Sequence, residues 1–233
     1  MTVPRVIDPA VHFDADTSLK YDGFVRKLVP DYQRIHDLVV AQLGLALNDD
    51  ARVLVIGAGT CTEVLALADF NPAWSFTAVE PSAPMVEKAK ERVHAAGLAD
   101  AVTFHTGTLD ALADQGPFDG TTAILMMQFV PADVKAALFK DIGWRLKPGA
   151  PLVMAHPIGD PESDEHVMHM GSWREHIQSV MPDRVDDIYA NVQGTLHFVS
   201  EEAQAQMLVD AGFDEPVRFH ARNLFGAWIV NKF

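Results

Sequence analysis

The fold of this chain is decided by the stretch Arg52-Val53-Leu54-Val55-Ile56-Gly57-Ala58-Gly59-Thr60-Cys61-Thr62. An apolar run ends in a glycine turn, and a helical pattern follows from Glu63 to Asp69. This order predicts a buried strand, a tight loop and the N-terminus of a helix. Because glycine has no Cβ, the loop backbone can turn sharply and come close to a ligand.

A carboxylate marks the end of the next predicted strand. The apolar run of residues 76–79 is followed by Glu80, whose side chain can accept hydrogen bonds from the two hydroxyls of a ribose. A glycine loop and an acid on adjacent strands favour a domain that binds a nucleoside cofactor. A plain strand-to-helix turn without a ligand would also explain the two glycines.

Strands and helices alternate on both sides of this unit. We predict strands at residues 52–56, 74–79, 101–105, 121–127 and 151–155, with helices at 60–69, 83–96, 109–113 and 132–146. This alternation predicts a Rossmann-like α/β fold whose mostly parallel sheet has helices on both faces. A helix at 200–211 and closing strands near 216–220 and 225–230 complete a seven-stranded sheet with an antiparallel last strand.

Two segments lie outside this alternation. Residues 1–17 have the composition of a loose arm, and two helices are predicted before residue 50, so residues 1–50 form a helical cover on a domain of residues 51–233. Residues 160–199 are rich in Asp, Glu, His and Met. We interpret them as a helical insert, or lid, over the carboxyl edge of the sheet.

Composition narrows the function. The 233 residues are 48% hydrophobic, which suits one sizeable α/β domain. A net charge of -14 disfavours direct binding to nucleic acid or to an anionic membrane. The single Cys61 excludes an intramolecular disulfide and a cysteine-based zinc site. With neither a signal-peptide pattern nor an apolar run of about 20 residues, we expect a cytoplasmic protein.

The identity of the nucleoside depends on departures from the dinucleotide-binding pattern. That pattern places a third glycine where this chain has Thr62. About fifty residues precede the loop, and Glu80 is followed by the segment Pro81-Ser82-Ala83-Pro84-Met85. Together with the closing hairpin, these features favour S-adenosylmethionine over NAD.

The order of motifs resembles the class I S-adenosylmethionine-dependent methyltransferases. The resemblance covers residues 52 to 233, and its motifs include Val-Leu-Val-Ile-Gly-Ala-Gly-Thr, Ala-Val-Glu-Pro-Ser-Ala-Pro-Met, Gly-Thr-Leu-Asp and Leu-Lys-Pro-Gly-Ala-Pro-Leu-Val. It implies that the loop Gly57, Ala58 and Gly59 contacts the methionine portion. It also implies that Glu80 binds the ribose hydroxyls, and that Met85 and the Thr108-Leu109 turn lie beside the adenine. Pro81 is a further candidate cofactor-binding residue.

A narrower resemblance, to the carboxy-S-adenosylmethionine synthases of tRNA wobble modification, covers nearly the whole chain. Its segments are Phe13-Asp14, Val29-Pro30-Asp31-Tyr32, Gln128-Phe129-Val130, Ala211-Gly212-Phe213 and residues 223–226. It implies that Tyr32 reaches the cofactor, and that the protein is a homodimer whose insert extends towards the neighbour.

Two departures favour an ordinary methyl donor over the carboxylated cofactor. That family has an aspartate where this chain has Thr108, and an arginine within a window that here, at residues 186–193, contains no basic residue. Arg184 or Arg174, both nearby in sequence, could substitute for that arginine.

Methyl transfer is an in-line displacement that positioning alone can support, so no side chain is obliged to act as a base. His156 follows the fifth strand at the edge where ligands bind, and could be a base or an incidental loop residue. Trp173, Arg174 and Arg222 are candidate substrate contacts, through a large apolar ring and bidentate carboxylate binding. A dimer interface would explain Trp173 equally well, and an ordinary surface ion pair is the better explanation of the two arginines. His166 and His169 lack a clear third ligand, so we expect no metal.

The fourth strand ends in Ile124-Leu125-Met126-Met127 rather than in an Asn-Pro-Pro-Tyr sequence, which argues against methylation of amides or of adenine amines. We therefore predict an S-adenosylmethionine-dependent methyltransferase that acts on a small molecule at O, N or S. Three alternatives remain: a carboxy-S-adenosylmethionine synthase-like enzyme that uses prephenate, an NAD(P)-linked oxidoreductase, and a non-catalytic cofactor-binding partner protein.

Overall fold

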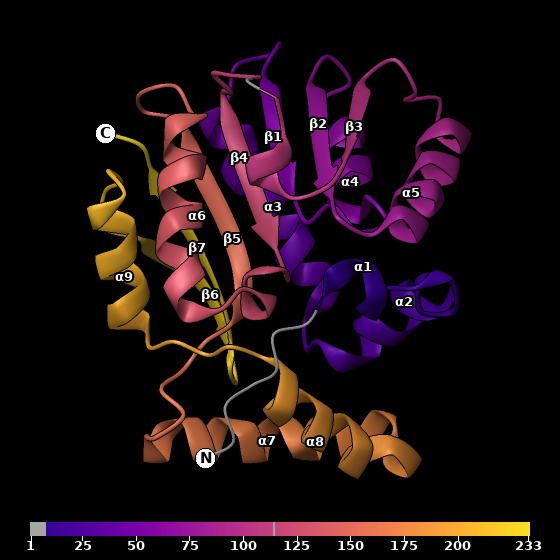
Figure 1. Ribbon diagram of the computed structural model, residues 1–233, viewed down its shortest axis with the longest axis vertical. Coiled ribbons are helices and arrows are strands. Elements are labelled where there is room, and N and C mark those ends of the chain that lie inside the picture. Colours follow the sequence, from indigo (N-terminus) through magenta and orange to yellow (C-terminus); the bar gives the residue numbers. More distant parts are fainter. Residues whose placement is uncertain (1–7, 114) are drawn as a thin grey trace.

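A computed structural model of the chain describes residues 8–113 and 115–233, and a twisted sheet forms its centre (Figure 1). The strand order is β3-β2-β1-β4-β5-β7-β6. The strands are β1 Arg52–Ile56, β2 Ser75–Glu80, β3 Val102–Thr106, β4 Gly120–Ile124, β5 Pro151–Pro157, β6 Val217–Arg222 and β7 Phe225–Asn231. Strands β1 to β5 are parallel, and β7 runs antiparallel between β5 and β6. The predicted seven-stranded sheet with an antiparallel last strand is confirmed.

Helices cover both faces of the sheet, because successive strand side chains point to opposite sides. Val53 and Val55 of β1 belong to one buried cluster, together with residues of α3 (Tyr32–Ala46), α4 (Thr62–Phe70) and α5 (Ala83–Ala95). Leu54 and Ile56 belong to the other cluster, together with residues of α6 (Ala132–Trp144) and α9 (Glu201–Asp210). Every residue of β1 except Arg52 is buried, as the apolar run predicts.

The N-terminal segment is more ordered than the sequence suggested. A loose arm over residues 1–17 is wrong for its described part, because α1 spans Pro9–His12 and α2 spans Ala15–Leu28. The carboxylate of Asp14 accepts a hydrogen bond from the backbone N–H of Thr17, 2.9 Å away, and caps α2. Residues 1–7 lie outside the described part of the chain.

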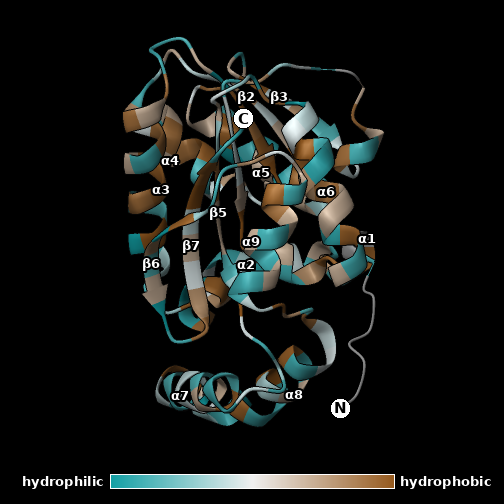
Figure 2. Cartoon of the chain, turned by 90° about the vertical axis from the view of Figure 1, so that its left-hand side faces the viewer, coloured by the Kyte–Doolittle hydropathy of each residue, from teal (hydrophilic) through white to brown (hydrophobic). Residues whose placement is uncertain are grey.

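The segment after β5 forms two helices joined by a short 3₁₀ turn. These are α7 (Asp164–Val180), η3 (Pro182–Arg184) and α8 (Val185–Thr195). Figure 2 shows α7 and α8 as a layer beyond the end of the sheet. Trp173 of α7 is buried, and its Nε1 donates a hydrogen bond to the carbonyl of Leu28, 2.9 Å away, at the end of α2. Helices therefore occupy the predicted cover and insert, whereas the domain boundaries at 50, 160 and 199 stay predictions.

None of the described helices is both long enough and apolar enough to cross a bilayer.

We expect Gly226→Ala to destabilise the protein by roughly 1–3 kcal/mol, because a Cβ at this position in β7 would collide with the buried indole ring of Trp228. Urea unfolding measures the change. Gly171→Ala is the matched control: nothing lies within 4 Å of a Cβ at this position in α7, so that variant should gain about 0.5–1 kcal/mol. Equal effects of the two substitutions would contradict the packing described here.

Candidate active site

The glycine loop between β1 and α4 is held against the end of β2. The backbone N–H groups of Gly57 and Ala58 both donate to the carbonyl of Val79, at 2.9 and 3.0 Å. Gly57 has a φ of 66°, and a Cβ there would lie 2.6 Å from the Cβ of Met126. Both the conformation and the close approach of Met126 therefore require glycine at this position.

The loop ends at Cys61, which is fully buried and also adopts a left-handed conformation, with a φ of 63°. Such a conformation costs a non-glycine residue about 1–2 kcal/mol. Burial raises the pKa of its thiol, so Cys61 stays protonated at neutral pH. It is a packing residue in a position that suits glycine.

The carboxylate of Glu80 joins the loop to the start of α5. Its Oε2 accepts a hydrogen bond from the backbone N–H of Gly59 and its Oε1 one from that of Ser82, both at 2.9 Å. Burial raises the pKa of Glu80, and these two hydrogen bonds oppose that shift. Glu80 is thus fixed in orientation at the end of β2.

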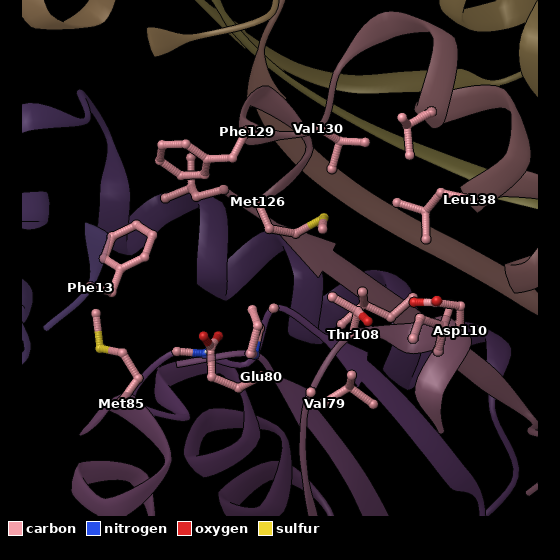
Figure 3. A pocket seen from close by; sticks show the side chains of 18 of the residues that line it. Phe13, Val79, Glu80, Met85, Thr108, Asp110, Met126, Phe129, Val130 and Leu138 are labelled. Carbon is pink, nitrogen blue, oxygen red and sulfur yellow. The ribbon is translucent and has the colours of Figure 1, made fainter. Parts of the chain in front are cut away.

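A cavity of about 450 Å³ opens in front of this carboxylate (Figure 3). Figure 3 shows Phe13 and Phe129 on one side of it, Glu80 at its floor and Leu138 and Asp110 at the far side. Most of the cofactor-binding residues predicted from the sequence line it. They are Gly57, Gly59, Glu80, Pro81, Met85, Thr108 and Leu109.

Two predicted cofactor residues, Ala58 and Tyr32, do not line this cavity. Tyr32 lies on α3, where its ring packs against that of His36 at a centroid distance of 4.4 Å and an interplanar angle of 39°. Burial raises the pKa of Tyr32 to about 12, and a hydrogen bond with Thr62 opposes the shift. Tyr32 lines neither cavity, and its contact with the cofactor stays a prediction.

Other lining residues were missed by the sequence reasoning. Tyr21 of α2 lines the cavity, as do Asp110, two residues beyond Thr108, and Asp141 of α6. The aspartate missing from position 108 was a signal that could have directed attention to Asp110. Tyr21 belongs to none of the sequence motifs, so no signal pointed to it.

A second cavity, of about 270 Å³, lies against the first. Four residues line both cavities: Phe13, Tyr21, Leu125 and Phe129. The rest of the second wall comes mainly from α2 and from the α7–α8 insert, and it includes Trp173 and Arg184. The predicted substrate contact Trp173 thus reaches a cavity. Arg184 was named in the sequence analysis only as a substitute.

The other predicted substrate and catalytic residues lie elsewhere. Arg174 forms an ion pair with Asp186 at 2.5 Å, and Arg222 is exposed at the end of β6. Neither arginine lines a cavity, so both are better explained as surface residues than as substrate contacts.

His156 is not placed for catalysis. It lies within β5 rather than after it, it is 1% exposed, and it lines neither cavity. Its Nε2 is 2.6 Å from the Oε1 of Gln204, and its ring packs on Trp228. Burial lowers the pKa of His156 to about 3. A neutral histidine enclosed in the core cannot exchange protons with a substrate in either cavity.

A polar network attaches α2 to the glycine loop. The hydroxyl of Thr60 donates to the Oδ1 of Asp22 at 2.6 Å, and Nη1 of Arg92 lies 3.1 Å from the other carboxylate oxygen of Asp22. The same Nη1 donates to the carbonyl of Thr60 at 2.8 Å. Helix α2 therefore carries its cavity-lining residues in a fixed relation to the loop.

In the part of the chain that the structure describes, no group of three or more His, Cys, Asp or Glu side chains is placed to hold a metal ion. His166 and His169 both lie on α7.

A parallel β3-β2-β1-β4-β5 sheet, an antiparallel β7, a glycine loop after β1 and a buried acid ending β2 together define the class I methyltransferase fold. Residues 53–149 match the methyltransferase domain family. These findings confirm the predicted fold.

Individual proteins are similar over most of the chain. Carboxy-S-adenosyl-L-methionine synthase of Campylobacter fetus subsp. fetus (strain 82-40) is 22% identical over 214 residues, which are 90% of this chain and 89% of that protein. The structure of magnesium protoporphyrin IX methyltransferase of Synechocystis PCC 6803, with bound SAM, has a TM-score of 0.67 at 16% identity. The match covers 100% of this chain and 100% of that chain.

The S-adenosylmethionine-dependent methyltransferase SibL has a TM-score of 0.64 at 16% identity, over 86% of this chain. The match covers 55% of SibL, so this chain spans about half the length of that protein.

Glu63→Gln should change how stability depends on pH. Burial raises the pKa of Glu63 from 4.5 to about 8, so between these values the folded protein holds a proton that the unfolded chain has released. The stability from this group is complete below pH 4.5 and is lost as the pH rises to about 8. We expect the stability of the variant relative to the wild type to increase over this window, by at most about 1.4 kcal/mol per pH unit.

Urea unfolding at several pH values between 5 and 8 measures this difference. Glu87→Gln is the control, because Glu87 is exposed on α5. A stability difference between wild type and Glu63→Gln that stays constant with pH would contradict the burial of an ionisable Glu63.

Proposed function

We propose that this protein is an S-adenosylmethionine-dependent methyltransferase that acts on a small molecule. One observation carries the proposal: two cavities share a wall, and the motifs of the cofactor pattern gather in only one of them. A methyl donor in the first cavity and an acceptor in the second would then meet at that wall. In-line displacement needs this arrangement, because the nucleophile must approach opposite the leaving sulfur.

Different residues of the first cavity suit the ribose, the adenine and the methionine portion of the cofactor. Each Glu80 oxygen accepts one backbone hydrogen bond, so each keeps a lone pair for a ribose hydroxyl. Met85 and Leu109 are buried apolar side chains that line this cavity, and both suit an adenine ring. Gly57 and Gly59 leave room for the methionine portion beside the loop.

The second cavity suits a compact acceptor. Its volume of about 270 Å³ is near the lower end of the range for ligand pockets, roughly 300–1,000 Å³. Most of its lining side chains are apolar or aromatic, and the net charge of -14 disfavours a nucleic-acid substrate. The acceptor lone pair forms a bond to the methyl carbon while the carbon–sulfur bond breaks, and the cationic sulfonium becomes a neutral thioether.

We further propose a cytoplasmic protein that forms a homodimer through its insert. The outer side of α7 supports this, because Val167 and Met168 are 65% and 62% exposed there. Apolar side chains side by side on a surface are typical of protein contacts.

Glu80→Gln should weaken the binding of S-adenosylhomocysteine by about 10–100-fold, because hydrogen bonds to a charged group contribute about 1.5–3 kcal/mol. Isothermal titration calorimetry on the full chain measures the affinity. Glu87→Gln, on the exposed side of α5, should bind as the wild type does. Wild-type protein that binds NADH but not S-adenosylhomocysteine would overturn the proposal in favour of the oxidoreductase alternative.

A second candidate function is that of a carboxy-S-adenosylmethionine synthase-like enzyme, with prephenate as the source of the carboxyl group. One observation favours it: Arg184 lines the second cavity and lies over the ring of Phe24 at 5.2 Å, where a carboxylate could meet it. The similarity to the Campylobacter synthase over 90% of the chain points the same way.

Mass spectrometry of the nucleoside that co-purifies with the protein separates the two functions. Under the first proposal we expect S-adenosylmethionine or S-adenosylhomocysteine. A carboxylated nucleoside that is lost in Arg184→Ala but retained in Arg174→Ala would establish the second function instead, because only Arg184 lines the cavity.

A further inference from the structure

The wall between the two cavities contains a single polar side-chain group. Of the four residues that line both cavities, Phe13, Leu125 and Phe129 are apolar, and only Tyr21 carries a hydroxyl. Tyr21 therefore lies where a methyl group would pass from donor to acceptor. This makes its hydroxyl the natural contact for the reacting atoms.

The hydroxyl of Tyr21 has no hydrogen-bond partner among residues 8–113 and 115–233. Its ring packs edge-to-face on Phe13, at a centroid distance of 5.7 Å and an interplanar angle of 88°. A phenol hydroxyl that lines a cavity without a protein partner is available to a ligand.

The protonation state of Tyr21 is also fixed. Burial raises its pKa far above the ordinary value, and the nearby Tyr32, Glu80, Glu63 and Asp22 act in the same direction. The hydroxyl therefore stays neutral in the physiological range. A neutral phenol can donate one hydrogen bond and accept another, but it cannot act as a general base.

The position of Tyr21 is held by its neighbours on both sides. Asp22, the next residue, is bonded to Thr60 in the glycine loop and to Arg92. Before α2, the carbonyl of Phe13 accepts a hydrogen bond from the hydroxyl of Ser82, 2.5 Å away. These contacts fix both ends of the segment that presents Tyr21, so its ring is pre-positioned before a ligand arrives.

We propose that Tyr21 orients the acceptor for methyl transfer: its hydroxyl hydrogen-bonds to the nucleophilic oxygen or nitrogen and directs a lone pair at the methyl carbon. The inference rests on the proposed methyltransferase function and names the acceptor class as a hydroxyl or amine compound. Tyr21 neither gains nor loses a proton. The acceptor electron pair forms the new carbon bond, the carbon–sulfur pair returns to sulfur, and the methylated product releases its proton to water.

The test compares two ligands that do not require the acceptor to be known. S-adenosylhomocysteine has no group at the position of the transferred methyl, whereas sinefungin carries a primary ammonium there on a carbon that replaces the sulfur. In the wild type, that ammonium would meet the Tyr21 hydroxyl. Calorimetric titration of the full chain with both ligands then reports on the hydroxyl alone.

Tyr21→Phe should weaken sinefungin about 5- to 20-fold while leaving S-adenosylhomocysteine within about twofold, because only one hydrogen bond to a charged group is removed. Tyr32→Phe is the matched control, a second buried tyrosine close to the loop but outside both cavities. Its ratio of the two affinities should equal that of the wild type.

The outcomes separate the inference from the function on which it rests. Wild-type protein that binds neither ligand would overturn the proposed function. Binding of both ligands with an unchanged ratio in Tyr21→Phe would overturn the role of Tyr21 and leave the function standing. The same loss in both tyrosine variants would mean a general disturbance of the loop, and would likewise overturn the inference.

Discussion

The arrangement of the whole site depends on the buried carboxylate of Glu80. It accepts a hydrogen bond from Gly59 on one side and from Ser82 on the other, and so fixes the distance between the glycine loop and the start of α5. Ser82 in turn caps α5 through Met85 and donates to the carbonyl of Phe13. One carboxylate thus sets the positions of the proposed ribose contact, a proposed adenine contact and the N-terminal cover.

This arrangement gathers acidic side chains under the loop. Glu63 and Glu80 are both buried, each has a raised pKa mainly because of that burial, and the charge of Glu80 adds to the rise in the pKa of Glu63. Arg92 contacts Asp22 nearby but forms no hydrogen bond with either glutamate. A cofactor with a sulfonium and an ammonium group would supply positive charge to this region. The acidic side chains of this region therefore favour a cationic ligand over a dinucleotide pyrophosphate.

The cofactor half could be predicted from the sequence because its chemistry is local. Gly57, Glu80 and Met85 lie at the ends of adjacent parallel strands or just beyond them, so their spacing along the chain already fixes their proximity. The prediction that His156 lies at the ligand-binding edge was wrong for a related reason. A side chain one residue nearer the middle of a strand points to a face of the sheet, and the face of His156 is the α6–α9 core rather than the cavity edge.

The acceptor half could not be predicted in this way, because its wall comes from segments that are distant in sequence. Thr17, Tyr21, Phe24, Val25 and Leu28 lie three or four residues apart on one side of α2, and all of them line the second cavity. The sequence shows part of this stripe, but a stripe that faces a core and one that faces a cavity have the same periodicity. Only the position of the insert decides between them, since Trp173 closes over Leu28 and leaves space beside Tyr21. Tyr32, the tyrosine of the Val29-Pro30-Asp31-Tyr32 segment, is the first residue of α3, and its ring packs against His36 instead. Under the proposed function, specificity therefore depends on how the cover and insert pack against each other, whereas cofactor binding depends on the sheet.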